Sequence, residues 1–210
     1  MPLCSARELE GHSFQRFVER RLVCLELLGT TTESAPIEQQ RGPAIACVDT
    51  SGSMQGAPEA VAKALLLAVV RQLVPQGRAV QLLLFGGPGE VAPIEIRRGQ
   101  RSLERLLDFL GMGFHAGTDY DTPLLRTLGL LETEAYARAD VLVVTDGLCR
   151  ASAGVTKRAA QAKQAAEARI LSVVVGGDPA GVEDFSDHVW LVDPNSPVAG
   201  GLDLQRWQPR

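Results

Sequence analysis

One carboxylate and two hydroxyls stand close together in residues 44–54, AIACVDTSGSM. Asp49 is followed by Ser51 and Ser53 at a spacing of two residues. Their oxygens are hard donors of the kind that Mg²⁺ prefers. Any one of these residues alone would more often end a turn or cap the following helix. The hypothesis of a metal site therefore depends on the whole set and on further ligands elsewhere in the chain.

The residues before Asp49 predict a buried strand. The apolar run 44–48 is bounded by Gly42-Pro43 on one side and by the polar, glycine-containing turn on the other. The polar cluster then lies in the loop at the carboxyl end of that strand. In open α/β sheets this edge is where ligands bind.

The pattern Asp-x-Ser-x-Ser after a strand resembles the metal-ion-dependent adhesion site of von Willebrand factor type A domains. That family completes its site with a Thr and an Asp far downstream. Gly117-Thr118-Asp119 precedes a predicted helix, and Thr145-Asp146-Gly147 ends a predicted strand. The resemblance implies a domain of this family from about residue 42 to residue 192. It implies that Ser51, Ser53 and Thr118 bind the metal ion directly. It also implies that Asp49 and Asp146 bind the ion either directly or through water.

The ligand set also implies a function. Neutral hydroxyls neutralise a cation less than carboxylates do, so the ion keeps an electrophilic open position, and a partner's Asp or Glu suits it. The helix expected to begin near Pro58 directs a positive dipole end towards the same place, which also favours an anion. The resemblance therefore implies a metal-dependent protein-interaction, or adaptor, module. Mg²⁺ is the expected metal, with Mn²⁺ or Ca²⁺ as alternatives.

Three further stretches resemble a bacterial subgroup. GPAIACVDTSGSM, FHAGTD and DHVWLVD…LQRW look like the C-terminal domain of the ViaA group, related to the CoxE-like proteins. Members of this group work with MoxR-type AAA+ ATPases, so the resemblance implies such an ATPase, or its substrate, as the partner. The ViaA group carries a long helical region before this domain, whereas about forty residues precede it here.

Periodicity predicts alternating strands and helices. Strands are expected at 44–48, 79–85, 91–96, 140–145, 170–175 and 188–192; helices are expected at 58–74, 102–110, 122–134 and 152–168, with one helical turn within 179–185. This order predicts an α/β, doubly wound, mostly parallel six-stranded sheet with helices on both faces. Pro93 favours an edge position for 91–96, paired as an antiparallel hairpin with the strand before it.

The two ends of the chain are expected to be appendages. Residues 1–41 should hold an amphipathic helix at 13–28 and a polar linker, residues 42–193 the main domain, and residues 194–210 a tail. The apolar stripe of the first helix would pack on the main domain or dock a partner.

Bulk properties exclude several classes of protein. The net charge of −4 argues against binding nucleic acid or an anionic membrane. No apolar run approaches a membrane span, and the N-terminus lacks the apolar core of a signal peptide. Four widely separated cysteines suggest reduced thiols in a cytoplasmic protein. The three histidines show no metal-ligand spacing.

Several residues near the motifs have two interpretations. Thr122 is expected to cap the helix that it begins. Asp119 and Asp121 are spare carboxylates, whose preferred role is to cap the same helix or to hydrogen-bond loop amides. Thr50 and Thr145 are expected to hydrogen-bond backbone groups. Met54 and Tyr120 either contact a partner at the rim of the site or pack inside the domain.

An enzymatic function is the alternative. A Mg²⁺-dependent phosphatase or phosphotransferase would use Asp49 as its nucleophile. A haloacid-dehalogenase-type hydrolase wants a second Asp two residues later, however, and Ser51 occupies that position. No obvious phosphate-clamping Lys and no other nucleophile motif is present. The sequence therefore favours a binding module that is not an enzyme.

Overall fold

A computed structural model describes residues 42–99 and 102–195. Nothing is described for the predicted N-terminal helix and linker, or for residues 196–210, so those expectations lie outside the described residues.

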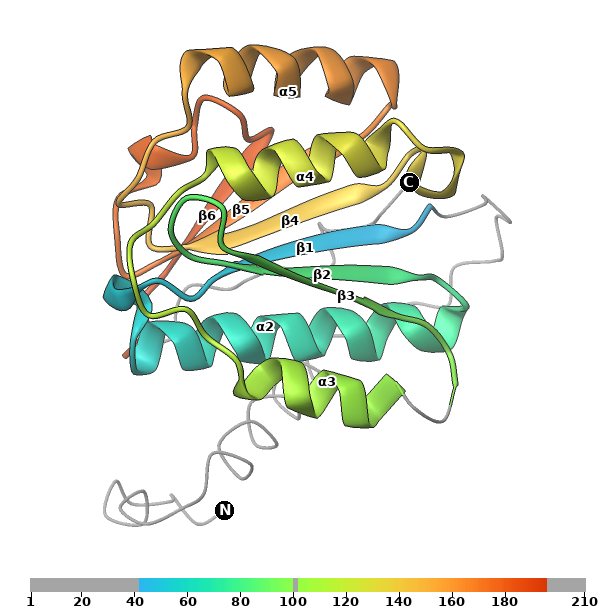
Figure 1. The fold of residues 1–210 in the computed structure, drawn as a ribbon, viewed down its shortest axis with the longest axis horizontal. Coiled ribbons are helices and arrows are strands. Elements are labelled where there is room, and N and C mark those ends of the chain that lie inside the picture. The colour runs from blue at the N-terminus through green and yellow to red at the C-terminus, as the bar shows by residue number, and fades with distance from the viewer. Residues whose placement is uncertain (1–41, 100–101, 196–210) are drawn as a thin grey trace, which may run out of the picture. The chain divides into compact units, whose positions relative to one another are not determined.

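The described part of the chain forms a six-stranded sheet in the order β3-β2-β1-β4-β5-β6 (Figure 1). All neighbouring strands are parallel except β2 and β3, which pair antiparallel as the predicted edge hairpin. Pro93 lies in that edge strand, where a missing backbone donor is tolerated. The predicted fold class is confirmed. The strands are β1 Ala44–Asp49, β2 Val80–Phe85, β3 Val91–Ile96, β4 Asp140–Thr145, β5 Arg169–Val175 and β6 His188–Val192.

Helices cover both faces of the sheet. Figure 1 shows α2 (Ala57–Leu73) and α3 (Ser102–Gly111) on one face, and α4 (Asp121–Leu131) and α5 (Ala153–Ala165) on the other. Short 3-10 turns lie at Gly52–Met54, Val74–Gln76, Glu134–Tyr136 and Pro179–Gly181. Both α4 and α5 end three residues before the ends expected from the sequence. Helix α4 ends early because the chain turns at Thr133, whose hydroxyl donates to the Leu130 carbonyl.

The central strand β1 separates two hydrophobic cores. Alternate residues of a strand point to opposite faces, so Ala44, Ala46 and Val48 join the core under α2 and α3. Ile45 and Cys47 join the core under α4 and α5. Every residue of β1 is buried, as expected for a central parallel strand.

Cys47 is a free thiol inside the second core. Burial raises the pKa of this thiol to about 12, although the nearby Thr127 hydroxyl opposes the shift. The thiolate is therefore strongly disfavoured, which agrees with a structural role.

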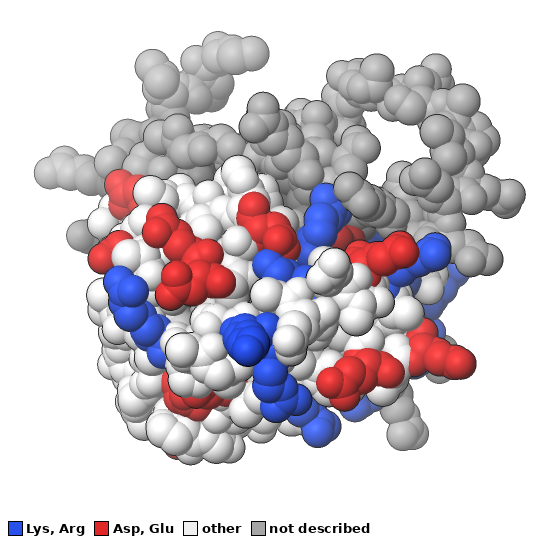
Figure 2. All heavy atoms as spheres, turned by 90° about the horizontal axis from the view of Figure 1, so that it is seen from above, with Lys and Arg blue, Asp and Glu red and all other residues white. Residues whose placement is uncertain are grey.

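The surface over α4 and α5 carries charges of both signs. Figure 2 looks down on this face and shows Lys and Arg interspersed with Asp and Glu. No helix among residues 42–99 and 102–195 is long and apolar enough to cross a membrane.

Candidate functional site

The strand order places a topological switch point at the carboxyl ends of β1 and β4. From β1 the chain passes to α2 on one face, and from β4 to α5 on the opposite face (Figure 1). Loops that leave neighbouring strands for opposite faces diverge and leave room between them, which is the usual ligand position in an open α/β sheet. Val48 pairs with Val144, so the next residues, Asp49 and Thr145, lie side by side.

Asp49 is the last residue of β1 and is completely buried. Its Oδ1 accepts a hydrogen bond from the Ser51 amide at 2.9 Å, and its Oδ2 accepts one from the Thr145 hydroxyl at 2.6 Å. The Ser51 and Ser53 hydroxyl oxygens lie 3.2 Å apart. Ser51 is buried and Ser53 is exposed, so this pair of hydroxyls runs from the interior to the surface.

Asp146 follows β4 and is 4% exposed. Its Oδ1 accepts a hydrogen bond from the Leu148 amide at 3.0 Å. Its Oδ2 is buried without a hydrogen-bond partner among the described residues. A buried carboxylate oxygen left unpaired is unfavourable, and each such atom calls for an explanation.

Thr118 is half-buried in the loop between α3 and α4. Backbone hydrogen bonds bring this loop to the segment after β1: the Gly52 amide donates to the Ala116 carbonyl at 2.8 Å. The Thr118 carbonyl accepts a weak hydrogen bond from Cys149, which lies three residues after Asp146. The loop therefore contacts both of the other segments that carry predicted ligands.

The electrostatic environment of Asp49 disfavours its charge. Burial is the largest cause, and it raises the pKa of Asp49, with a further contribution from the negative charge of Asp146. Hydrogen bonds from Thr145 and Ser51 oppose the shift. Among the described residues no three His, Cys, Asp and Glu side chains gather into a metal cluster.

The raised pKa of Asp49 predicts how pH affects metal-free stability. The unfolded state loses this proton at a lower pH, near the ordinary Asp value of about 4, than the folded state does. Between these two pKa values the folded state binds more protons, so the Asp49 contribution to stability falls as pH rises. Urea unfolding in EDTA checks this: the difference in free energy of unfolding between wild type and Asp49→Asn should decrease from acidic to neutral pH. A constant or rising difference would contradict the prediction.

Several sequence interpretations need correction. Thr50 bonds the backbone as predicted, because its hydroxyl donates to the Phe85 carbonyl. Thr145 also bonds the backbone as predicted, because its hydroxyl accepts from the Gly147 amide. The prediction was incomplete, since the same hydroxyl donates to the Asp49 carboxylate and contacts the Tyr120 hydroxyl at 2.8 Å. Met54 and Tyr120 are 0% and 1% exposed, so packing is their role and rim contact is excluded.

The two spare carboxylates act on backbone amides. Asp119 accepts hydrogen bonds from the Asp121 and Thr122 amides at the start of α4. Asp119, and not Thr122, is therefore the capping side chain. Asp121 accepts a hydrogen bond from the Ser152 amide at 2.7 Å, which ties α4 to the start of α5.

Sequence reasoning missed the Tyr120–Thr145–Asp49 chain of hydrogen bonds. Thr145 lies 96 residues from Asp49, and only the pairing of β1 with β4 brings them together. A strand alignment that placed Val48 opposite Val144 would have supplied the signal.

A comparison with protein families settles the classification. The model of the von Willebrand factor type A domain matches residues 44–148, half of the chain. The chain belongs to this family. Domains of this family are commonly protein-interaction modules and typically have no enzymatic activity.

Solved structures agree with the fold of a von Willebrand factor type A domain. A von Willebrand factor type A protein from Catenulispora acidiphila superimposes with a TM-score of 0.64 at 17% identity, covering 80% of this chain and 42% of the other. Proximal thread matrix protein 1 of the mussel byssus gives 0.58 at 14%, covering 76% and 45%. An aerotolerance-related membrane protein from Bacteroides fragilis gives 0.50 at 16%, covering 63% and 67%. The chain thus spans less than half the length of the first two proteins, and these low identities show the fold alone.

Proposed function

We propose that this von Willebrand factor type A domain binds a protein partner through a divalent metal ion. Asp49, Ser51, Ser53, Thr118 and Asp146 would hold the ion, and an Asp or Glu of the partner would complete its coordination. Mg²⁺ is the proposed metal, with Mn²⁺ or Ca²⁺ as alternatives. When bound, the ion supplies an electrophilic position for a carboxylate.

The unpaired Oδ2 atom of Asp146 carries this proposal. It is a buried acceptor to which no group in residues 42–99 or 102–195 donates, and it is close enough to Asp49 for the charge of Asp146 to raise the Asp49 pKa. A cation would supply the missing partner and offset the repulsion between two carboxylates. The adjacent hydroxyls of Ser51 and Ser53 add the oxygen donors that a hard cation requires. The residues present therefore fit a divalent metal.

The burial of Asp49 supports binding over phosphoryl transfer. A nucleophilic carboxylate must be open to a bulky phosphate ester, and Asp49 is completely buried, whereas a small ion held by the surrounding residues needs only one of its remaining lone pairs. A generic phosphate ester with Mg²⁺ tests the enzyme alternative directly. Turnover that Asp49→Asn abolishes would revive it.

The finer identity of the partner rests on the ViaA-like and CoxE-like sequence resemblance. We propose that the partner is a MoxR-type AAA+ ATPase, or its substrate, in the bacterial cytoplasm. The apolar, glycine-containing and tryptophan-containing stretches quoted above support this subgroup, and nothing in the net charge of −4 suggests a nucleic-acid partner.

Two binding measurements test the proposal. Titration calorimetry with MgCl₂ should show one site in the wild-type protein. Pull-down of a MoxR-type ATPase encoded beside this chain should then weaken in EDTA and in Ser51→Ala. The control is Thr133→Ala, which removes an exposed hydroxyl after α4 at the opposite edge of the sheet and should change neither result. Mg²⁺ binding with a pull-down unaffected by EDTA would refute metal-mediated contact.

A further inference from the structure

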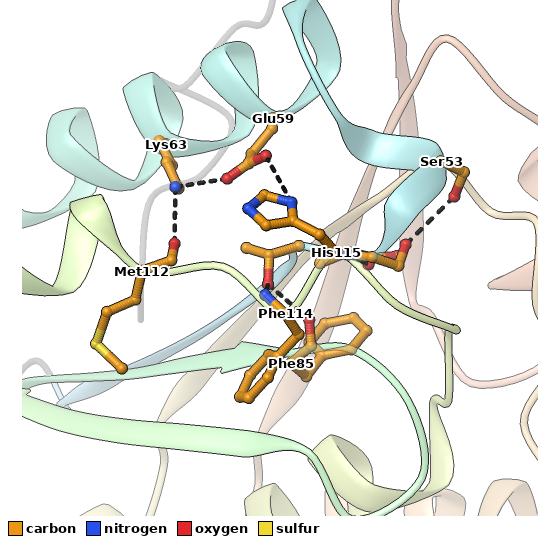
Figure 3. A network of polar contacts seen from close by, with 10 residues as sticks. Ser53, Glu59, Lys63, Phe85, Met112, Phe114 and His115 are labelled. Carbon is orange, nitrogen blue, oxygen red and sulfur yellow. Dashed lines mark hydrogen bonds and ion pairs between the residues drawn. The ribbon is translucent and has the colours of Figure 1, made fainter.

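Three ionisable side chains join helix α2 to the loop that carries Thr118 (Figure 3). Glu59 lies in the first turn of α2 and Lys63 lies one turn later. Lys63 Nζ is 2.5 Å from Glu59 Oε1, and the two side chains are only 9% and 11% exposed. The third member, His115, belongs to the loop between α3 and α4.

The pair on α2 reaches the loop at two points. Lys63 Nζ donates a hydrogen bond to the Met112 carbonyl at 2.9 Å. His115 Nδ1 lies 3.7 Å from Glu59 Oε2, an attractive contact when the imidazole is protonated. In Figure 3 the side chains of Glu59, Lys63 and His115 point towards one another across the space between helix and loop.

Gly113 makes this approach possible. A Cβ at this position would lie 2.6 Å from His115 Nε2 and 3.3 Å from Glu59 Oε1. His115 itself has a backbone φ of 53°, in the left-handed region that residues other than glycine rarely adopt. A strained residue of this kind persists when the surrounding contacts hold it in place.

The same loop residues contact the segment that follows Asp49. The amides of Phe114 and His115 donate to the hydroxyl and the carbonyl of Thr50, at 3.2 and 2.8 Å. The Gly52 amide donates back to the Ala116 carbonyl. Residues 112–116 therefore lie between α2 and the Asp49–Ser53 segment and are fixed to both.

We propose that Glu59, Lys63 and His115 form a clamp that fixes the Thr118-bearing loop against the Asp49–Ser53 segment. They are positioning residues, and none of them is a metal ligand. The proposal rests on the proposed function for its consequence, because ligands from separate loops bind one ion only if those loops are held in register. A buried pair of charges is a poor source of stability, but its hydrogen bonds are directional. The hydrogen bond from Lys63 to the Met112 carbonyl therefore fixes the position of the loop relative to α2, which contact between two apolar side chains would not do as narrowly.

Lys63→Met removes the ammonium but keeps the length of the side chain. Mg²⁺ affinity measured by calorimetry should fall about tenfold, the usual effect of losing a residue that orients a ligand. Amide hydrogen exchange in EDTA should accelerate in residues 112–118 and at Gly52. Arg169→Met is the matched control: it removes a cation from the Asp140 ion pair at the opposite end of the sheet. It should leave both quantities unchanged even if it lowers the melting temperature equally.

Gly113→Ala tests the same clamp without removing a charge. The added methyl would separate His115 from Glu59, so the loss of affinity and the faster exchange should resemble those of Lys63→Met. Gly111→Ala is its control, because a Cβ there meets no atom within 4 Å. Both alanine variants are compared at equal folded fraction.

The two readouts separate failure of the clamp from failure of the proposed function. If the wild-type protein binds no Mg²⁺, metal-dependent binding fails, while the exchange data in EDTA still decide whether the clamp holds the loop. If exchange in residues 112–118 is the same in Lys63→Met and Arg169→Met, the clamp is refuted. Selective acceleration in Lys63→Met and Gly113→Ala supports it.

Discussion

Asp49→Asn is expected to lower Mg²⁺ affinity by about 100-fold or more while the domain remains folded. The substitution keeps the size of the side chain and removes one of the two carboxylates near the proposed ion. Because Mg²⁺ depends on charged oxygen ligands to replace its tightly held water, losing a carboxylate weakens the site more than losing a hydroxyl does.

The fold should tolerate Asn at this position. The carboxylate is completely buried, so it is not the exposed loop ligand that its place in the sequence suggests. An amide oxygen can still accept the hydrogen bond from the Ser51 amide, and an amide NH₂ can donate to the Thr145 hydroxyl, whose proton is free to rotate. Removing a charge next to Asp146 also relieves repulsion.

Calorimetry with MgCl₂ and thermal unfolding in EDTA check both parts of this prediction. Asp108→Asn is the control, because it removes the same charge from an exposed position on α3. Unchanged Mg²⁺ affinity in Asp49→Asn would exclude this aspartate from the site. Loss of the cooperative unfolding transition would show that the carboxylate is required for folding.

Asp140→Ala is expected to destabilise the domain by about 3–5 kcal/mol, the usual penalty for breaking a buried ion pair. Asp140 begins β4 and is 4% exposed. Its Oδ2 lies 3.6 Å from a terminal nitrogen of Arg78, whose side chain is 3% exposed, and its Oδ1 lies 3.0 Å from Arg169. Without the carboxylate the buried Arg78 cation would lose the anion beside it, while the Arg169 side chain, 30% exposed, would keep its contact with water.

Urea unfolding measures this loss of stability. Glu167→Ala is the contrasting variant, because its ion pair with Arg138 has side chains that are 72% and 68% exposed. Such a pair contributes little, so a change within about 0.5 kcal/mol is expected. A loss below about 1 kcal/mol in Asp140→Ala would mean that other groups near Arg78, such as the Gly42 carbonyl, suffice to compensate its charge.

The sequence predicted the elements around the site well, because each has a local signal. The run from Ala44 to Val48 is apolar throughout, and the structure makes it the central buried strand. Pro93 predicted the edge position of β3, since a residue without an amide hydrogen fits only there. Capping was harder: Asp119 and Thr122 both have suitable oxygens, and only the geometry of the loop assigned the role to Asp119.

The sequence by itself determined that Asp49 and Asp146 lie where two buried strands end, and hence that they lie at the carboxyl edge of an α/β sheet. It also determined the first part of the family resemblance, the Asp-x-Ser-x-Ser motif, because this motif consists of residues that are close together in the chain. The tertiary structure alone decided which distant side chains meet: Thr145 with Asp49 across 96 residues, and Lys63 with the Met112 carbonyl across 49. Such contacts depend on strand order, register and the path of long loops, which the spacing of residues along the chain does not encode.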